Sequence, residues 1–415
     1  MPLIIDFHLH SKYSRATSAQ MIPEIISQTA KIKGIDIVGT GDFTHPLWLN
    51  ELKNKLVETE NGLYQLKENQ DRNSPRFIVS GEISNIYSRA GQTRRVHNLI
   101  ILPSLQSAEK ISHRLSLEGN LLSDGRPMLG LDSEELLKIV LEIEPKAMFI
   151  PAHIWTPWYS VFGSMSGFNS LEEAFGQNTK YLAALETGLS SDPAMNWRLS
   201  ALDPFSLVSN SDAHSPEHLG REVNVLEVAF DYDDLFNVIK NKDKNRFLYT
   251  IEFYPEEGKY HYDGHRLCGV CFSPAETKKH QGLCPVCGRP LTIGVLSRVE
   301  ALADRNSGEI PANAIPFKKL VPLKEILAEV LETKPASKKV SELYHKLIDY
   351  FGSEFKVLLE AQSNDLERIG GERLAEALSR VREGKLTIRP GYDGEYGQIK
   401  IFNGESNNQN QGVLF

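Results

Sequence analysis

The chain begins with a strand-like stretch, Ile4–Ser11, "IIDFHLHS", in which an apolar run ends in two histidines one residue apart. In a β-strand, residues i and i+2 point to the same face, so His8 and His10 face one side together. Such a pair is either the polar end of a strand or the first part of a metal site. The two histidines alone do not separate these interpretations, so the rest of the chain must.

The composition is that of an ordinary globular protein. Of 415 residues, 41% are hydrophobic and 24% are charged, which is enough for about two to three domains. No apolar run reaches membrane-spanning length and no export signal opens the chain, so we expect a cytoplasmic protein without a membrane partner. The net charge of -8 argues weakly against a nucleic-acid partner, because phosphate binding usually requires basic residues. Local basic clusters could still bind DNA despite this net charge.

Residues 1–260 alternate short apolar runs with helical periods, among them a helix that stops at Gly34 and another near 133–143. This alternation predicts an α/β fold with a parallel sheet covered by helices. Several runs end in polar residues, as in "IDIVGTGDFTH", "SGEIS", "AMFIPAHIW" and "FSLVSNSDAH". Ligand sites in such folds lie beyond the carboxyl ends of the strands, so we expect these polar residues to meet.

The remaining chain divides into three further segments. Residues 261–295 are short of apolar periods and contain all four cysteines, which predicts a small metal-binding module. Residues 296–402 are mainly helical, with apolar residues at i, i+3, i+4 and i+7, and end in a short β-like stretch. Residues 403–415, "NGESNNQNQGVLF", are polar until the last three positions, and we expect a flexible tail.

Six histidines and three acids occur in or just after the apolar runs. They are His8, His10, Asp42, His45, Glu82, His97, His153, Asp212 and His214. Imidazole and carboxylate together suit zinc, manganese or iron, and so many donors predict more than one metal. Metals that share a carboxylate lower the pKa of a water and stabilise both oxygens of a displacement at phosphorus. The pattern therefore favours phosphoester hydrolysis.

The order H-x-H, D, E, H, H, D-x-H resembles the polymerase and histidinol phosphatase (PHP) family. The resemblance implies a distorted (β/α)7 barrel with three metals. It assigns His8, His10, Glu82 and Asp212 to one metal, Glu82 with His97 and His153 to a second, and His214 with Asp42 or His45 to a third. Members often carry an acid or histidine shortly after the first pair, where this chain has Ser14 and Arg15. We expect the Arg15 guanidinium to hold the scissile phosphate there.

The cysteines Cys268, Cys271, Cys284 and Cys287 are spaced C-x2-C-x12-C-x2-C. Two such knuckles can close on one ion, which predicts a tetrahedral structural zinc with four thiolates. Paired C-x-x-C motifs in redox catalysis are the lesser alternative. The nearby His261, His265 and His280 are surplus to this set, and we expect them to face solvent or DNA.

A longer resemblance is to the endonuclease Q family of DNA repair enzymes. The matching segments are "DFHLHSKYSRATS", "GTGDFTHP", "PAHIWTPW", "SNSDAHS", "IEFYPEEGKYHYDGHR" and the cysteine module with "LSRVEALADR". The resemblance implies a nucleoid-associated endonuclease that cuts 5′ to hypoxanthine, uracil, xanthine and abasic sites. It implies catalytic Asp212 and Glu82, zinc in the module and in the active site, and Mg²⁺ or Mn²⁺ as possible catalytic ions.

An enzyme of this kind recognises a damaged nucleotide after extruding it from the DNA double helix. Aromatic, amide and basic side chains near the site, and a Gly-rich entry to a helix, are our candidates for DNA contact. They are Trp155, Trp158, Tyr159, Asn196, Arg198, Lys278, Lys279, Gly370 and Gly371. A hydrophobic lid and a helix–helix turn are equally good interpretations of the aromatic loop and the glycine pair.

Two further expectations concern the tail and the class of function. The terminal "QGVLF", with Gln411, Leu414 and Phe415, resembles the short peptides that dock on the sliding clamp. The alternative functions are a PHP-type small-molecule phosphatase and a DNA-binding scaffold with a degenerate site. A small-molecule phosphatase has no evident use for a zinc module, and a degenerate site would not retain so many ligands.

Overall fold

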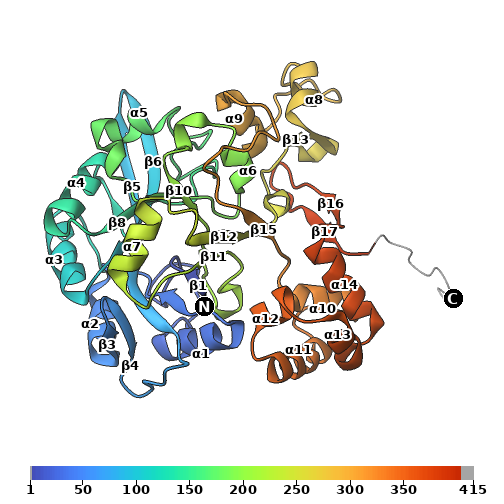
Figure 1. Cartoon of the computed structure of the whole chain (residues 1–415). Coiled ribbons are helices and arrows are strands. Elements are labelled where there is room, and N and C mark those ends of the chain that lie inside the picture. The colour runs from blue at the N-terminus through green and yellow to red at the C-terminus, as the bar shows by residue number, and fades with distance from the viewer. Residues whose placement is uncertain (1, 403–415) are drawn as a thin grey trace, which may run out of the picture.

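Seven strands surround the centre of the N-terminal part of this computed structural model, which describes residues 2–402 (Figure 1). They are β1 (Leu3–Asp6), β2 (Ile37–Gly39), β5 (Arg76–Arg89), β6 (Gln92–Leu102), β8 (Met148–Pro151), β9 (Ala184–Glu186) and β10 (Ser206–Val208). Strands β1, β2, β5, β6 and β8 pair in that order, and β9 pairs with β10. The Ala183 amide donates to the Phe149 carbonyl at 2.9 Å, joining β9 to β8. A bridge between Leu9 and Ala213 returns the ring to β1, giving the distorted barrel that the resemblance implies.

Helices cover the outside of this barrel. They are α1 (Pro23–Lys33), α2 (Pro46–Lys55), α3 (Leu105–Leu115), α4 (Ser133–Ile143), α5 (Leu171–Phe175), α6 (Pro193–Asn196) and α7 (Tyr232–Lys240). Helix α1 ends as predicted at Gly34, which has a φ of 86° and donates to the Ala30 carbonyl. Helix α4 occupies the predicted range, begins at the Asp132 cap and buries Leu136, Leu137 and Val140. The 3.6-residue apolar period therefore identified these helices correctly.

The sheet differs from the prediction at β5 and β6, which form an antiparallel hairpin. The strands are joined at Ala90 and Gly91, whose φ values of 53° and 73° suit a tight hairpin turn. They pair continuously from Val79 opposite Leu102 to Arg89 opposite Gln92. Both strands are buried on their two faces along the apolar part, so their sequences resemble parallel strands. His97 consequently lies within a strand, beside Glu82, rather than at a carboxyl end.

Further strands extend the sheet at both edges. They are β3 (Leu56–Glu60), β4 (Leu63–Leu66), β7 (Met128–Leu129), β11 (Val223–Leu226), β12 (Phe247–Glu252) and β15 (Phe317–Lys319). Strand β11 is antiparallel to β1, β12 follows β11, and β15 pairs in parallel with β12. A segment of the predicted helical part, residues 317–319, therefore belongs to the barrel sheet.

The cysteine module and the helices lie to one side of the barrel (Figure 1). The module contains β13 (Asp263–His265), β14 (Val270–Phe272) and α8 (Pro274–Lys279), and α9 (Val295–Leu302) follows. The C-terminal elements are α10 (Leu323–Val330), α11 (Lys338–Phe351), α12 (Glu354–Leu359), α13 (Ser363–Gly370), α14 (Glu372–Arg382), β16 (Thr387–Arg389) and β17 (Gln398–Lys400). Short 3-10 turns are η1 (Gly176–Tyr181), η2 (Ser200–Leu202), η3 (Pro216–His218), η4 (Pro255–Glu257) and η5 (Arg266–Cys268).

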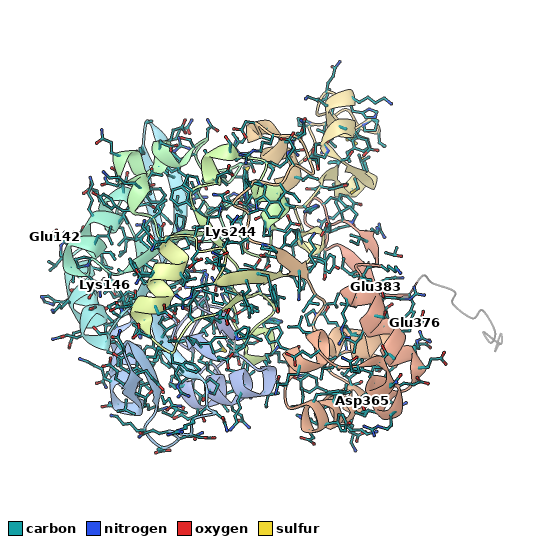
Figure 2. All side chains as sticks on the ribbon, in the orientation of Figure 1. Glu142, Lys146, Lys244, Asp365, Glu376 and Glu383 are labelled. Atoms are coloured by element: carbon teal, nitrogen blue, oxygen red, sulfur yellow. The ribbon has the colours of Figure 1, made fainter. Side chains whose placement is uncertain are left out.

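Charged side chains cover the outer faces of these helices, for example Glu142 and Lys146 on the barrel and Glu376 on α14 (Figure 2). Within residues 2–402, no helix has both the length and the apolar character needed to cross a membrane. The predicted clamp-binding residues Gln411, Leu414 and Phe415 lie outside the described residues.

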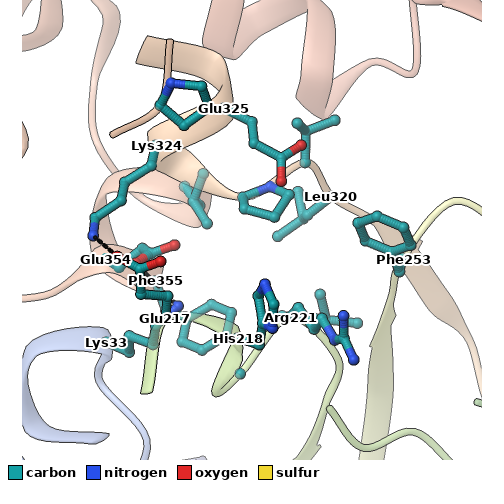
Figure 3. A pocket seen from close by; sticks show the side chains of 16 residues that line it. Lys33, Glu217, His218, Arg221, Phe253, Leu320, Lys324, Glu325, Glu354 and Phe355 are labelled. Carbon is teal, nitrogen blue, oxygen red and sulfur yellow. Dashed lines mark hydrogen bonds and ion pairs between the residues drawn. The ribbon is translucent and has the colours of Figure 1, made fainter. Parts of the chain in front are cut away.

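A cavity of about 200 Å³ separates the barrel from the C-terminal helices. Figure 3 shows Lys33, His218 and Arg221 on the barrel side, facing Glu325 across the cavity, with the Phe355 ring beside His218. Arg221 donates from Nε to the Ser211 carbonyl at 2.8 Å and from Nη2 to the Asp212 carbonyl at 3.3 Å. The cavity wall is therefore connected to the loop that carries the predicted catalytic Asp212.

Candidate active site and metal-binding clusters

Four predicted residues meet at one end of the barrel. Ligand atoms of His8, His10, Glu82 and Asp212 all lie within 4.8 Å of one another. Three of these side chains are fully buried, and Asp212 is half-buried with 26% of its side chain exposed. Two imidazoles and two carboxylates around one point form a donor set that suits zinc, manganese or iron.

A second group shares Glu82 with the first. Ligand atoms of Glu82, His97 and His153 also lie within 4.8 Å of one another. Glu82 Oε1 is 2.8 Å from His97 Nδ1 and 3.0 Å from His153 Nε2, while Glu82 Oε2 is 3.4 Å from His10 Nε2. Each carboxylate oxygen of Glu82 therefore faces a different group of histidines. This is the arrangement of a carboxylate that bridges two cations.

The orientation of His8 leaves its Nε2 nitrogen available to a metal ion. His8 Nδ1 lies 2.9 Å and 3.1 Å from the two oxygens of Glu186, so it donates to that carboxylate. His8 Nε2 is buried without a hydrogen-bond partner among the described residues, and lies 3.7 Å from both Glu82 and Asp212. An unpaired buried nitrogen costs about 1–3 kcal/mol, which coordination removes. The residues present therefore fit a metal centre.

Glu186 is a functional residue that the sequence analysis missed. Besides His8, its carboxylate accepts from the backbone amide of His153 at 2.8 Å and from Asn210 Nδ2 at 2.9 Å. It therefore fixes one ligand from each metal-binding group. Glu186 ends strand β9, so it carries the same signal, an acid at the end of an apolar run, that identified the other candidates.

The structure does not bring Asp42, His45 and His214 into either group, although they were predicted to hold a third metal. Asp42 Oδ1 contacts His10 Nδ1 at 3.0 Å, and Asp42 Oδ2 accepts from Ser11 and Ser14 at 2.6–2.8 Å. Asp42 therefore orients His10 in the way that Glu186 orients His8.

The two histidines are engaged differently. The His45 ring is buried and stacks on Tyr13 with centroids 4.3 Å apart, and burial lowers the pKa of His45. His214 Nδ1 lies 2.9 Å from the Asp212 carbonyl, and its ring is 4.4 Å from that of His10. His214 is thus adjacent to the first group, whereas His45 packs behind the wall of the site.

Charge in the two groups favours bound cations. Burial raises the pKa of Glu82, but His97, Arg126 and His8 outweigh it, so the pKa lies well below its usual value. Burial lowers the pKa of His97 to about 4. The pKa values of His8 and His10 are raised well above normal because neighbouring carboxylates outweigh burial. Ionised carboxylates that draw protons onto adjacent imidazoles bind metal ions in competition with those protons.

Four of the ten non-glycine residues with positive φ among residues 2–402 lie in or beside the two groups. Asp42, His153, Tyr159 and Asp212 have φ values of 48°, 30°, 62° and 47°. For residues with a side chain, this left-handed region costs about 1–3 kcal/mol each and persists only where the surroundings hold it. Three of the four were singled out from the sequence as candidate metal ligands, so the strain coincides with the proposed chemistry.

The Arg15 side chain is 75% exposed, and its Nε lies 3.4 Å from Asp124 Oδ2; its role in holding the scissile phosphate stays a prediction. A different arginine, Arg126, places Nη1 at 2.8 Å from Glu82 Oε2. Arg126 lies in an irregular loop after α3 rather than at the end of a strand. The apolar periodicity and the motif spacing of the sequence therefore did not identify it.

Three of the predicted DNA contacts are structural. Trp155 is buried and donates from Nε1 to Asn196 Oδ1 at 2.8 Å. Arg198 donates to the Arg305 carbonyl at 2.7 Å and pairs with Glu300 at 2.7 Å. Asn196 is also fully buried. Trp155 and Asn196 therefore hold the aromatic loop against the following segment, and Arg198 joins that segment to Glu300 and Arg305.

The neighbouring aromatics are placed differently. The Tyr159 ring lies 4.7 Å from that of His97, at the edge of the second group. Trp158 is 36% exposed and meets Tyr260 edge-on at 5.5 Å. Lys278 and Lys279 are exposed on α8. Gly371, with a φ of 87°, separates α13 from α14, and Gly370 is the last residue of α13.

The cysteine module differs from the predicted set of four thiolates. Ligand atoms of Cys268, Cys284, Cys287 and His265 lie within 4.8 Å of one another, and Cys271 is not in this group. In the β13–β14 hairpin, His265 is opposite Val270 and Gly264 is opposite Cys271. Side chains alternate between the faces of a strand, so His265 shares the face of Val270, which packs with Cys284. Cys271 points to the other face.

The module therefore has three thiols and one imidazole around one point. Burial and the neighbouring thiols raise the pKa of Cys268 to about 11, and burial raises that of Cys271. Three sulfurs this close ionise together only with a cation between them. His261, which was predicted to face solvent or DNA, is buried, and its Nδ1 has no hydrogen-bond partner among the described residues.

Comparison with known proteins identifies relatives of this chain. The family model "MJ0043 C-terminal domain" matches residues 322–385. An uncharacterized protein of Methanocaldococcus jannaschii is 34% identical over 63% of this chain, and the chain spans 34% of that protein's length. An uncharacterized protein of Bacillus subtilis is 28% identical over 95% of this chain and 98% of its own length.

Two solved structures match nearly the whole chain. The lesion-specific endonuclease of Pyrococcus furiosus, an endonuclease Q, is 32% identical with a TM-score of 0.85, and the match covers 96% of this chain and 95% of that one. An endonuclease Q complex with a 27-mer duplex carrying an abasic lesion at the active site is 32% identical with a TM-score of 0.83, over 99% and 100% of the two chains. The chain therefore belongs to the endonuclease Q family of DNA repair endonucleases, which are hydrolases.

Proposed function

We propose that the protein hydrolyses the DNA phosphodiester on the 5′ side of a damaged nucleotide, namely one carrying hypoxanthine, uracil or xanthine, or an abasic site. The observation that carries the proposal is Glu82, whose two oxygens face two separate groups of histidines. When bound there, divalent cations supply an activated water and neutralise charge on the phosphate. The donor set suits zinc, manganese or iron, and Mg²⁺ is also a candidate for catalysis.

In this proposal, the oxygen of water bonds to phosphorus while the bond between phosphorus and O3′ breaks. The leaving oxygen gains a proton and becomes a 3′-hydroxyl, and the damaged nucleotide keeps a 5′-phosphate. Glu82 and Asp212 hold the reacting groups in place, while Glu186 and Asp42 fix the rings of His8 and His10. Rigid outer residues of this kind keep ligands in the productive geometry.

Recognition of the lesion is assigned to the edge of the second group. Trp158 is partly exposed, and the Tyr159 ring lies 4.7 Å from that of His97, tilted by 40°, so an extruded nucleotide that reaches His97 also meets Tyr159. Aromatic faces bind bases with little preference for sequence, and a damaged base costs less to extrude. The related complex with an abasic duplex supports DNA as the partner.

The test uses labelled duplexes that contain one uracil, one hypoxanthine or one abasic site, with undamaged duplex as the control. We expect the protein with Mg²⁺ or Mn²⁺ to cut each damaged strand 5′ to the lesion, leaving a 3′-hydroxyl, and the Asp212→Asn variant to be inactive. Equal cutting of damaged and undamaged duplexes, or cutting by Asp212→Asn at the normal rate, would contradict the proposal.

A further inference from the structure

The loop that carries Arg126 is fixed against the first metal-binding group. Gly125 donates to the Tyr13 carbonyl at 3.0 Å, and the amides of Arg15 and Arg126 donate to Asp124 Oδ1 at 3.3 Å and 3.1 Å. Immediately after the loop, β7 pairs in parallel with β5, with Met128 opposite Ser84. Arg126 is therefore held beside the strand that carries Glu82 and does not depend on a free loop for its position.

The same loop fills the space beside Asp42. A Cβ on Gly125 would lie 2.3 Å from Asp42 Oδ2 and 2.4 Å from Ser14 Oγ, so the backbone is packed directly on these side chains. Both Asp42 oxygens are engaged, one with His10 and the other with Ser11 and Ser14. Among residues 2–402, the barrel offers two groups of metal ligands, and both contain Glu82. The backbone at Gly125 therefore occupies space that a third cation at Asp42 would need, and Asp42 Oδ2 already accepts from Ser11 and Ser14.

The Arg126 guanidinium stands next to the bridging carboxylate. Its Nη1 is 2.8 Å from Glu82 Oε2, and 26% of the side chain is exposed, so part of it faces the opening of the site. An arginine has five N–H donors in a planar fork. Within the described chain its guanidinium makes this hydrogen bond to protein, which leaves donors for a ligand.

We propose that Arg126 is a catalytic residue that does the work of the third cation: its free N–H groups bind a non-bridging oxygen of the scissile phosphate while Nη1 stays on Glu82. This rests on the proposed function, because it assumes that the reacting group is a phosphodiester. A fixed positive charge there stabilises the charge that develops on the phosphate oxygens during attack. Unlike a metal ion, it remains when the protein is treated with a chelator.

The variants Arg126→Gln and Arg126→Lys test this, with Arg114→Gln as the matched control because Arg114 is an exposed arginine paired with Glu118 on the surface. Metal content is measured by mass spectrometry on purified protein. We expect three ions per chain in every variant, one for each of the three ligand groups. A fourth ion in the wild type, or the loss of barrel ions in Arg126→Gln, would overturn the proposal.

Cleavage is measured on the abasic duplex and on the generic phosphodiester bis(p-nitrophenyl) phosphate. Arg126→Gln should lower kcat/KM by about 100-fold or more on both, Arg126→Lys should retain part of the activity, and Arg114→Gln should match wild type. Binding of the abasic duplex in Ca²⁺ should show a shallower salt dependence for Arg126→Gln, by about one contact. Unchanged cleavage and an unchanged salt slope would refute the role of Arg126.

The two substrates separate the failure of this inference from failure of the proposed function. If wild type hydrolyses the generic ester but not damaged DNA, the proposed function is wrong, and the ester still reports on Arg126. If wild type cuts damaged DNA and Arg126→Gln cuts it equally well, the proposed function stands and the inference is wrong.

Discussion

The barrel site and the cysteine module both gather metal-binding side chains, but over very different lengths of chain. The barrel draws His8 and Asp212 together from positions more than 200 residues apart, whereas the module takes His265, Cys268, Cys284 and Cys287 from a single short segment. A seven-stranded scaffold fixes the first group, and one small hairpin fixes the second. The barrel can therefore hold strained residues and outer partners, and for the module we predict that a bound metal supplies the order.

This comparison predicts that loss of one shared ligand damages the barrel site most. Glu82→Gln removes a charge that serves both groups of histidines, so both barrel ions should be lost and the module ion kept. The rate of cleavage of the abasic duplex should fall by more than about 100-fold. A loss of about that size is typical when a residue that only orients a metal ligand is replaced. The protein should still fold, as its melting temperature in EDTA will show. A variant that retains both barrel ions would contradict the bridging role.

Loss of one ligand in the cysteine module should lower the stability of the protein and its metal content. Cys284→Ser removes a buried ligand and should release the module ion and lower the melting temperature, because binding energy at such a site is folding energy. Cys271→Ser is the matched control, since Cys271 lies on the opposite face of its hairpin. Equal metal loss in both variants would restore the four-thiolate site that the sequence predicts.

Replacing Glu186, which orients metal ligands without belonging to either group, should have an intermediate effect on activity and metal affinity. Glu186→Gln keeps the shape but removes the charge that holds His8 and the His153 amide. Activity and metal affinity should fall by about 10–100-fold, with Glu142→Gln, an exposed acid on α4, as the control. Metal affinity is measured by titration of the chelated protein. A wild-type affinity would remove Glu186 from the positioning role.

The smallest effect concerns Glu257, at the junction of barrel and module. Burial, then Glu325 and Glu256, raises the pKa of Glu257 from 4.5 to about 8, and its Oε1 has no hydrogen-bond partner in the described chain. The folded state therefore retains a proton that the unfolded state has released, so stability falls as pH rises from about 4.5 to 8.

The variant Glu257→Gln should remove this contribution. Its melting temperature should exceed that of wild type at pH 9 and differ little at pH 5, whereas Glu68→Gln, at an exposed position, should follow wild type at both. Identical pH dependence in Glu257→Gln and wild type would show that the Glu257 carboxyl titrates normally.

The sequence predicts those parts of the molecule that depend on neighbouring residues in the chain, such as the period and caps of a helix. The helices at Pro23–Lys33 and Ser133–Ile143 follow from apolar period, caps and Gly34. The six residues of the two barrel groups follow from their places along the apolar runs, except that periodicity does not reveal the β5–β6 hairpin. That hairpin places His97 beside Glu82 by antiparallel register, which only pairing determines.

The errors share one physical cause, because each depends on tertiary contacts or on register. Cys271 has ideal spacing, yet the pairing of β13 with β14 turns it away and brings in His265. Arg126 was not singled out, because it reaches Glu82 from a loop that packs on Tyr13 and Asp42. Trp155 and Asn196 were predicted to meet DNA and instead meet each other. Residue type alone does not distinguish these outcomes.

The most direct test of the shared carboxylate is anomalous diffraction from crystals of the wild-type protein grown with Mn²⁺ and Zn²⁺. The account predicts two peaks on either side of Glu82, one near His8, His10 and Asp212 and one near His97 and His153, and a third among His265, Cys268, Cys284 and Cys287. Arg126 should remain beside Glu82 with no peak at Asp42. A peak held by Asp42 or His45, or a single peak at Glu82, would contradict the account.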